Sequence, residues 1–409
     1  MVDVTQREEA VRAALDVIED GKAVLLAYER NGQERGAMLC AAEHADADMI
    51  NLMATHARAL VCVALPAERC KALGLELQPR SGRDNNVDQF TVSVEAAAGV
   101  STGISAADRA RTIEVCIDSQ SGPQNIVCPG HVFPAQVHVS GVLGRAFAAE
   151  AAVDLARLAG QKSATGVYTK VLSKSGELAN YSELRALANR LGMVLLNVED
   201  LVRYRMARER LVRKIESGVV PTRFGEFEIS VWENLVNGNN HVLIQRGSVE
   251  PPEDEAAPLV RVHSQCLTGD VFQSLRCDCG DQLAIAFDRI NAEKNGAVLY
   301  LRQEGRGIGL VNKLLAYGLQ DRGLDTVEAN EELGFKADQR DYGIGAQILQ
   351  QAGYSRVRML TNNPMKIKGV REFGLHVEDR VSLVVPANED NERYLSAKKK
   401  KMGHLLDSV

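Results

Sequence analysis

The sequence contains no run of about 20 consecutive apolar residues, the length that a transmembrane helix requires. Its opening residues, Met1 to Glu9, include neither the basic segment nor the apolar segment of a secretory signal peptide. Positive charge is not in excess, because 48 Lys and Arg residues face 54 Asp and Glu residues and the net charge is −6. These absences predict a cytoplasmic protein that binds no membrane and no nucleic-acid backbone, and they leave room for a local cationic pocket.

Two domains are expected, because 409 residues exceed what one hydrophobic core usually supports. The hydrophobic fraction of 45% and the charged fraction of 25% are typical of a folded globular chain. In the first half, short predicted strands and helices alternate, which indicates an α/β fold. A polar helix predicted at 203–216, ended by Gly218 and Pro221, marks the boundary. We predict an α/β domain at residues 1–205 and a second domain, α/β with α+β character in part, at residues 206–409.

Local signals place several elements within these domains. Thr5 and Glu8 form a capping-box pattern, which predicts a helix that Gly21 ends. Hydrophobic periodicity predicts the remaining elements. They are strands at 23–28, 191–196, 226–232, 241–245, 259–263, 297–301 and 356–360, and helices at 282–290, 312–321 and 341–352.

Eight cysteines in a reducing compartment are expected to be thiols or metal ligands. Cys266, Cys277 and Cys279 have a spacing that lets three thiolates converge on one zinc ion and leave a fourth position open, which is the catalytic arrangement. Two alternatives are a structural zinc site completed by His263 and three reduced core cysteines. The other five are predicted to be core thiols: Cys40, Cys62, Cys70, Cys116 and Cys128.

Two polar segments follow predicted strands in the second half. The first, Arg302 to Leu310, is a glycine-rich turn that contains two arginines, and the second runs from Thr361 to Lys366. Backbone N–H groups in such a turn and guanidinium groups beside it suit phosphate oxygens. Beside an open zinc site, this pattern indicates a phosphorylated substrate that is attacked by activated water.

Residues from Pro221 to Leu406 resemble GTP cyclohydrolase II. The three-cysteine segment lies among motifs that stand in the order of that family. These motifs are Arg261–Ser264, Gln303–Arg306, Asp325–Asn330, Ala337–Tyr342, Thr361–Pro364 and Lys401–Leu406.

The resemblance implies hydrolysis of GTP to 2,5-diamino-6-ribosylamino-4(3H)-pyrimidinone 5′-phosphate, formate and pyrophosphate, the first step of riboflavin biosynthesis. One zinc ion per chain on the three cysteines would activate water for attack on carbon 8 of the purine. Tyr317 would orient that water or stabilise the opened ring. Arg340 would be the nucleophile on the α-phosphorus, with Asp338 as the proton acceptor, and a purely electrostatic role for Arg340 is the alternative.

The same resemblance implies a substrate-binding set, Mg²⁺ on the GTP phosphates and a homodimer. The family usually has Glu where this chain has Gln265, so the charge at that position is lost. The implied GTP-binding residues are Arg261, Val262, His263, Ser264, Gln265, Gln282, Glu304, Gly305, Arg306, Thr326, Thr361 and Lys366.

Residues from Ala10 to Tyr204 resemble 3,4-dihydroxy-2-butanone 4-phosphate synthase. The motifs that carry this resemblance are Ala54–Arg58, Gly103–Thr112, Pro129–Pro134 and Glu150–Gly160. The family binds Mg²⁺ and ribulose 5-phosphate through an acidic loop, a His and a later Glu. The five corresponding positions in this chain are Gly32, Gln33, Ala37, Ala148 and Lys170. Alanine offers no metal ligand and lysine repels a cation, so we expect a first domain without synthase activity.

Two other interpretations remain at this point. The chain could be a bifunctional enzyme that retains the synthase activity, or a non-catalytic regulatory protein that binds zinc and a nucleotide. The sequence is compatible with a product that feeds riboflavin and with one that feeds a related specialised metabolite.

Overall fold

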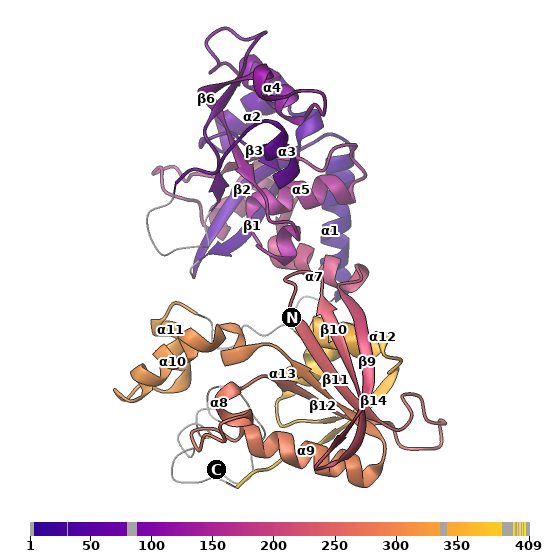
Figure 1. The fold of residues 1–409 in the computed structure, drawn as a ribbon. Helices are drawn as coiled ribbons and strands as arrows, with labels where there is room; N and C mark the ends of the chain where they lie inside the picture. Colours follow the sequence, from indigo (N-terminus) through magenta and orange to yellow (C-terminus); the bar gives the residue numbers. More distant parts are fainter. Residues whose placement is uncertain are drawn as a thin grey trace. The chain divides into compact units, whose positions relative to one another are not determined.

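The computed structural model describes residues 4–30, 32–79, 88–335 and 342–386 and the single positions 396, 399, 401, 403 and 405. Contacts within the chain divide it into two compact units, Met1–Arg205 and Met206–Val409 (Figure 1). Both units combine helices with a sheet, which confirms the predicted two-domain, mixed α/β architecture. Within the described residues, no helix has the length and apolar character needed to cross a bilayer.

The first unit is built on a sheet whose described strands follow the order β4-β6-β3-β7-β2-β1-β8, with β5 paired to β6. Strands β1 and β2 form an antiparallel hairpin, and β7 pairs antiparallel with β2. The strands are β1 (Val24–Arg30), β2 (Gln33–Ala41), β3 (Cys62–Leu65), β4 (Gln89–Phe90), β5 (Val94–Ala96), β6 (Ile126–Gln136), β7 (Gly166–Lys170) and β8 (Leu195–Asn197).

Helices cover both faces of this sheet, because alternate residues of each strand point to opposite faces. Val24 and Leu26 of β1 belong to a buried cluster with residues of α1, α5 and α7, whereas Leu25 joins a cluster with residues of α2, α3, α4 and α6. The helices are α1 (Val4–Glu19), α2 (Ala47–His56), α3 (Ala67–Ala72), α4 (Ala106–Ile117), α5 (Ala148–Leu158), α6 (Tyr181–Leu191) and α7 (Val198–Arg208), with short 3₁₀ helices at Ala42–His44, Pro123–Asn125 and Gly141–Leu143.

The second unit has a sheet in the order β15-β14-β12-β13-β11-β10-β9. The strands from β9 to β13 pair as antiparallel neighbours along β9-β10-β11-β13, while β12 is parallel to both β13 and β14, and β14 is parallel to β15. The strands are β9 (Val212–Thr222), β10 (Gly225–Asn234), β11 (Asn240–Arg246), β12 (Leu259–Ser264), β13 (Gly296–Leu301), β14 (Arg356–Leu360) and β15 (His376–Val381).

Helices α9 and α12 pack against opposite faces of this second sheet. Phe287 and Ile290 of α9 pack with Val298 of β13 on one face. On the other face α12 lies close to β13. A Cβ atom added at Gly345 of α12 would lie 3.3 Å from the Leu301 side chain of β13. The helices are α8 (Leu267–Asp270), α9 (Cys279–Glu293), α10 (Gly309–Gln320), α11 (Thr326–Glu332), α12 (Gly343–Gln351) and α13 (Pro364–Glu372), and Glu304–Gly307 forms a short 3₁₀ helix.

Most of the predicted elements are present, but the polar helix predicted at 203–216 is wrong. Helix α7 ends at Arg208, and β9 begins at Val212. Pairing with β10 explains the difference, because β9 is joined to that strand from Val212 to Thr222 and a backbone ladder outweighs the helical preference of a few charged residues. Val212 is fully buried, whereas the rest of β9 is largely exposed at the edge of the sheet.

Candidate active site

The candidate site lies at the carboxyl ends of three neighbouring strands. Strands β14, β12 and β13 are adjacent and parallel, so the segments that follow them meet at one edge of the sheet. Those segments begin at Gln265, Arg302 and Thr361, and all three contribute to one cavity. The topology therefore brings together three motifs that are spread over about a hundred residues of the sequence.

Nearly all of the predicted site residues that the structure describes line this cavity. Val262 is the exception: it is buried in β12, and its backbone carbonyl accepts a 2.8 Å hydrogen bond from Lys366 Nζ. Asp338 and Arg340, two of the three predicted catalytic residues, lie outside the described residues. The lining set includes Arg261, His263, Ser264, Gln265, Cys266, Cys277, Cys279, Gln282, Glu304, Gly305, Arg306, Tyr317, Thr326, Thr361 and Lys366.

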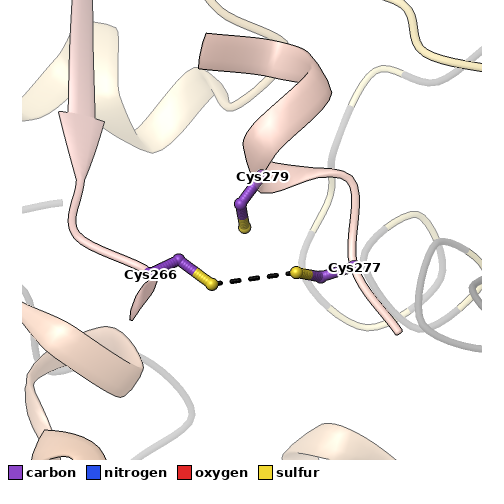
Figure 2. A group of neighbouring side chains, drawn as sticks. All are labelled: Cys266, Cys277 and Cys279. Carbon is purple, nitrogen blue, oxygen red and sulfur yellow. Dashed lines mark hydrogen bonds between the residues drawn. The ribbon is translucent and has the colours of Figure 1, made fainter. Parts of the chain in front are cut away.

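Three cysteine thiols converge in this cavity (Figure 2). Cys266 follows β12, Cys279 opens α9, and the three sulfur atoms lie within 4.8 Å of one another. The Sγ atoms of Cys266 and Cys277 are 3.7 Å apart. Three thiolates bound to zinc at about 2.3 Å in tetrahedral geometry would have sulfur atoms separated by roughly 3.8 Å, so the donor set and its spacing fit a zinc ion.

The cluster found among the described residues contains these three ligands without a histidine. His263 is turned to another partner, since its Nε2 atom lies 3.0 Å from Asp270 Oδ1. Burial lowers the pKa of His263, so this side chain is neutral near pH 7. This geometry disfavours the structural site completed by His263. Among the cysteines predicted to be core thiols, Cys40, Cys62, Cys70 and Cys116 are buried, but the prediction is wrong for Cys128, which is exposed.

Asp270 and Gly269 fix the loop that carries the first cysteine. Asp270 Oδ2 accepts hydrogen bonds from the Cys266 backbone N–H at 2.9 Å and from the Tyr300 hydroxyl at 2.7 Å. A Cβ atom added at Gly269 would lie 2.9 Å from Cys277 Sγ, so a larger residue there would push the thiols apart. Hydrogen bonds from Cys277 and Cys279 lower the pKa of the Cys266 thiol, and the contact with Cys266 raises the pKa of Cys277.

Tyr317 reaches the cysteine cluster from α10. Its hydroxyl lies 3.4 Å from Thr268 Oγ1, which is itself 3.6 Å from Cys266 Sγ. The Arg276 guanidinium stands over the Tyr317 ring at 5.2 Å from the centroid. Burial raises the pKa of the Tyr317 phenol, so the hydroxyl keeps its proton and can donate a hydrogen bond to a bound molecule.

The cavity lining also carries buried positive charge. Arg261 and Lys366 are each 5% exposed. Arg261 donates to the Leu360 carbonyl at 3.0 Å and to Gln282 Oε1 at 2.5 Å, which holds the guanidinium in place. Arg306 contributes a third cation from the glycine-rich turn. A chain with a net charge of −6 thus presents a local cationic pocket that suits an anionic substrate.

Sequence reasoning missed Lys313, which lies between the cysteines and the glycine-rich turn. Its ammonium is within hydrogen-bond distance of Cys266, Thr268 and Glu304. Burial alone would lower the pKa of Lys313, but the Cys266 thiolate and the hydrogen bond to Glu304 outweigh burial and raise the pKa above its usual value. A sequence signal was present, because Lys313 precedes Tyr317 by four residues and so shares its helix face.

In the first unit, the structure brings together several of the positions at which the synthase resemblance implies metal and substrate ligands. Ala37 of β2 pairs directly with Lys170 of β7. Ala37 and Ala148 are both fully buried and belong to the same hydrophobic cluster. The Lys170 ammonium forms an ion pair with the nearly buried carboxylate of Asp88. These side chains do not fit a divalent cation, because two are apolar and the third is a cation that occupies the nearby carboxylate.

The chain matches known families over both units. The family model for 3,4-dihydroxy-2-butanone 4-phosphate synthase matches residues 12–204, and the model for GTP cyclohydrolase II matches residues 213–382. The riboflavin biosynthesis protein RibBA of Synechocystis sp. is 46% identical over 97% of this chain and 72% of its own length. RibBA of Chlorobium phaeovibrioides is 45% identical over 98% of this chain and 97% of its own length.

A solved structure is also similar to this chain. It is the crystal structure of RibBX, a two-domain 3,4-dihydroxy-2-butanone 4-phosphate synthase from A. baumannii. The TM-score is 0.71 at 28% sequence identity, and the match covers 91% of this chain and 99% of that chain. Together with the two domain matches and the relatives of 45% and 46% identity, this places the chain in the RibBA family of riboflavin biosynthesis proteins, with a GTP cyclohydrolase II domain as its second half.

Proposed function

We propose that the second unit hydrolyses GTP to 2,5-diamino-6-ribosylamino-4(3H)-pyrimidinone 5′-phosphate, formate and pyrophosphate, as the first step of riboflavin biosynthesis or of a related specialised route. The observation that carries this proposal is the convergence of three thiols, Tyr317 and buried cations in one cavity. The match of residues 213–382 to GTP cyclohydrolase II supports it independently of this geometry.

In this proposal each group of the cavity has a separate task. Cys266, Cys277 and Cys279 hold a zinc ion, which supplies the Lewis acidity for hydrolysis at the purine ring. The Tyr317 hydroxyl stands beside the cluster and orients the reacting groups by donating a hydrogen bond. Arg261 and Lys366 bind the anionic portion of GTP, which carries Mg²⁺ on its phosphates as part of the substrate.

The direct test is to identify what the purified chain makes from GTP. We expect release of formate and pyrophosphate and a product with the mass of the diaminopyrimidinone phosphate. A product that retains the formyl group would limit the activity to ring opening. Unchanged GTP, in protein that contains zinc, would overturn the proposal in favour of a nucleotide-binding regulatory protein.

Tyr317→Phe is expected to keep GTP binding and to slow turnover by about 10²- to 10⁴-fold, the range for one positioned proton donor. The change removes one hydroxyl and little volume, so packing against Lys313 and Arg276 should persist. Steady-state rates and the ratio of formate to ring-opened intermediate measure the effect. A rate and product ratio equal to those of the unmodified protein would exclude a catalytic role for Tyr317.

Arg340→Ala is expected to abolish pyrophosphate release, and Arg340→Lys to be almost as damaging, because lysine lacks the planar guanidinium fork. This prediction rests on the sequence resemblance, since Arg340 lies outside the described residues. Pyrophosphate release in a single turnover measures it. If lysine restores most of the rate, the role of Arg340 is electrostatic and the covalent role fails.

A homodimer is also proposed for this chain. Helix α10 exposes Val311, Leu314 and Leu315, whose side chains are between 52% and 73% exposed. A second copy of the chain could cover these apolar side chains, whose exposure in one place is unusual for a free surface. Light scattering during size-exclusion chromatography tests this, and a molar mass near 44.5 kDa at micromolar concentration would contradict it.

The first unit has two candidate functions. The comparisons favour retained synthase activity, the alternative interpretation above, because a synthase family model covers residues 12–204 and RibBA proteins align over nearly the whole chain. One observation in this chain favours a unit without that activity, namely the apolar and cationic side chains at Ala37, Ala148 and Lys170. An assay with ribulose 5-phosphate and Mg²⁺ decides between the two candidates.

A further inference from the structure

We propose that Lys313 is a positioning residue of the cysteine cluster. Its ammonium compensates the negative charge of the cluster and, together with Glu304, holds the Cys266 loop against the turn after β13. The inference rests on the proposed function only in assuming that the three thiols hold a divalent metal. It adds a residue from α10 to a centre whose ligands come from the segments around α8 and α9.

The contacts of Lys313 are unusually complete for a lysine on a helix surface. Its Nζ atom lies 3.1 Å from Cys266 Sγ, 2.9 Å from Thr268 Oγ1 and 2.9 Å from Glu304 Oε1. An ammonium group has three protons to donate, and these three acceptors use all of them. The residue is only 9% exposed, so the three contacts take the place of water.

The second carboxylate oxygen of Glu304 connects Lys313 to the loop that carries Cys266. Its Oε2 atom accepts a 2.7 Å hydrogen bond from the Leu267 backbone N–H, next to Cys266 in the chain. The Glu304 carboxylate is therefore bound to the cysteine loop on one side and to Lys313 on the other. We infer that the Glu304 side chain positions this loop, whereas the resemblance alone implied a contact with GTP.

Charge gives the reason for placing a lysine here. Three thiolates and a divalent cation carry a net charge of −1, and a buried net charge is costly unless it is compensated. The nearest cation to Cys266 among the described contacts is the Lys313 ammonium. Groups that contact metal ligands in this way tune metal affinity, and their loss typically weakens binding by about 10- to 100-fold.

The alternative is that Lys313 and Glu304 form an ordinary ion pair that only holds α10 against the turn. That alternative predicts a loss of fold stability without a specific effect on metal binding. The proposal predicts instead that metal affinity falls in protein whose fold is intact.

The experiment compares Lys313→Met, Lys313→Gln and Lys313→Arg with the full-length unmodified protein. Lys368→Met is the control, because Lys368 is an exposed lysine of α13 whose ammonium lies 3.7 Å from Glu372 Oε1 on the same helix. Metal-free protein is titrated with Co²⁺ alone, and the thiolate-to-cobalt charge-transfer absorption reports both affinity and ligation. Circular dichroism of the metal-free variants checks the fold.

We expect Lys313→Met and Lys313→Gln to weaken Co²⁺ affinity by about tenfold or more and Lys313→Arg to restore most of it. Lys368→Met should bind Co²⁺ as the unmodified protein does. Unchanged Co²⁺ affinity in folded Lys313→Met would overturn the proposal. Lys313→Gln serves the same purpose should the methionine variant fail to fold. Because no GTP is present, a failure of the GTP cyclohydrolase proposal would appear separately, as absent formate release by the unmodified protein.

Discussion

Cys277→Ser should lose bound zinc and formate release together, with turnover reduced by several orders of magnitude. A neutral serine hydroxyl is a poor substitute for a thiolate, and Cys277 is 7% exposed, so water cannot easily take its place. Cys266 and Cys279 alone would leave the metal with two protein ligands. Metal content by atomic spectroscopy and formate release from GTP measure the two losses on one preparation.

Cys128→Ser is the matched control for this experiment. Cys128 is an exposed thiol of the first unit and is not part of the cysteine cluster. Its replacement should leave zinc content and formate release unchanged. Full GTP turnover by metal-free protein would contradict the zinc prediction.

The same variant separates a catalytic metal from a structural one. If the metal sits at an open catalytic position, Cys277→Ser should remain folded, because the hydrophobic cluster that contains Phe287 and Val298 includes none of the three cysteines. If the metal closes a structural site, its loss should unfold this unit. Circular dichroism of the variant therefore tests the prediction of a three-ligand catalytic centre against its structural alternative.

Local patterns in the sequence predicted three of the segments that line the cavity. These three lie directly after short apolar runs that become parallel strands, as Cys266 does after β12 and Thr361 does after β14. Parallel neighbours end at the same edge of a sheet, so these segments meet because β12 pairs in parallel with both β13 and β14, a pairing that the local patterns did not predict. The cysteine spacing added the chemistry, and the structure brings the three sulfur atoms together.

Features that depend on distant partners were missed. Lys313 and Cys266 are 47 residues apart, and a lysine in a helical pattern looks like an exposed charge until its acceptors are known. Asp270 is similar, since its partners His263 and Tyr300 come from two different strands. The helix predicted at 203–216 includes the first five residues of strand β9, because their charged side chains give no sign of the pairing with β10 that determines their conformation.

The first unit raises a different difficulty, because family membership and the residues at particular positions point in opposite directions. The fold depends on many buried residues, such as Leu25 and Leu26 of β1, which are fully buried in this chain. Catalysis depends on a few polar groups, whose replacement leaves the core intact. A family model can therefore match residues 12–204 whether or not the chemistry remains.

The intact protein, supplied with ribulose 5-phosphate and Mg²⁺, should form no detectable 3,4-dihydroxy-2-butanone 4-phosphate while it releases formate from GTP in the same preparation. The reason lies in the residues present. The buried side chains of Ala37 and Ala148 offer no oxygen or nitrogen to a cation, and the Lys170 ammonium forms an ion pair with the Asp88 carboxylate. Removal of a proton next to a carbonyl requires a positioned base and, in this family, a bound metal. Losses within one site act together, so the expected defect is complete rather than graded. Formate release shows that the preparation is folded and active. Butanone phosphate formation that depends on Mg²⁺ would instead establish the bifunctional enzyme that the RibBA relatives favour, and it would require ligands other than these three side chains.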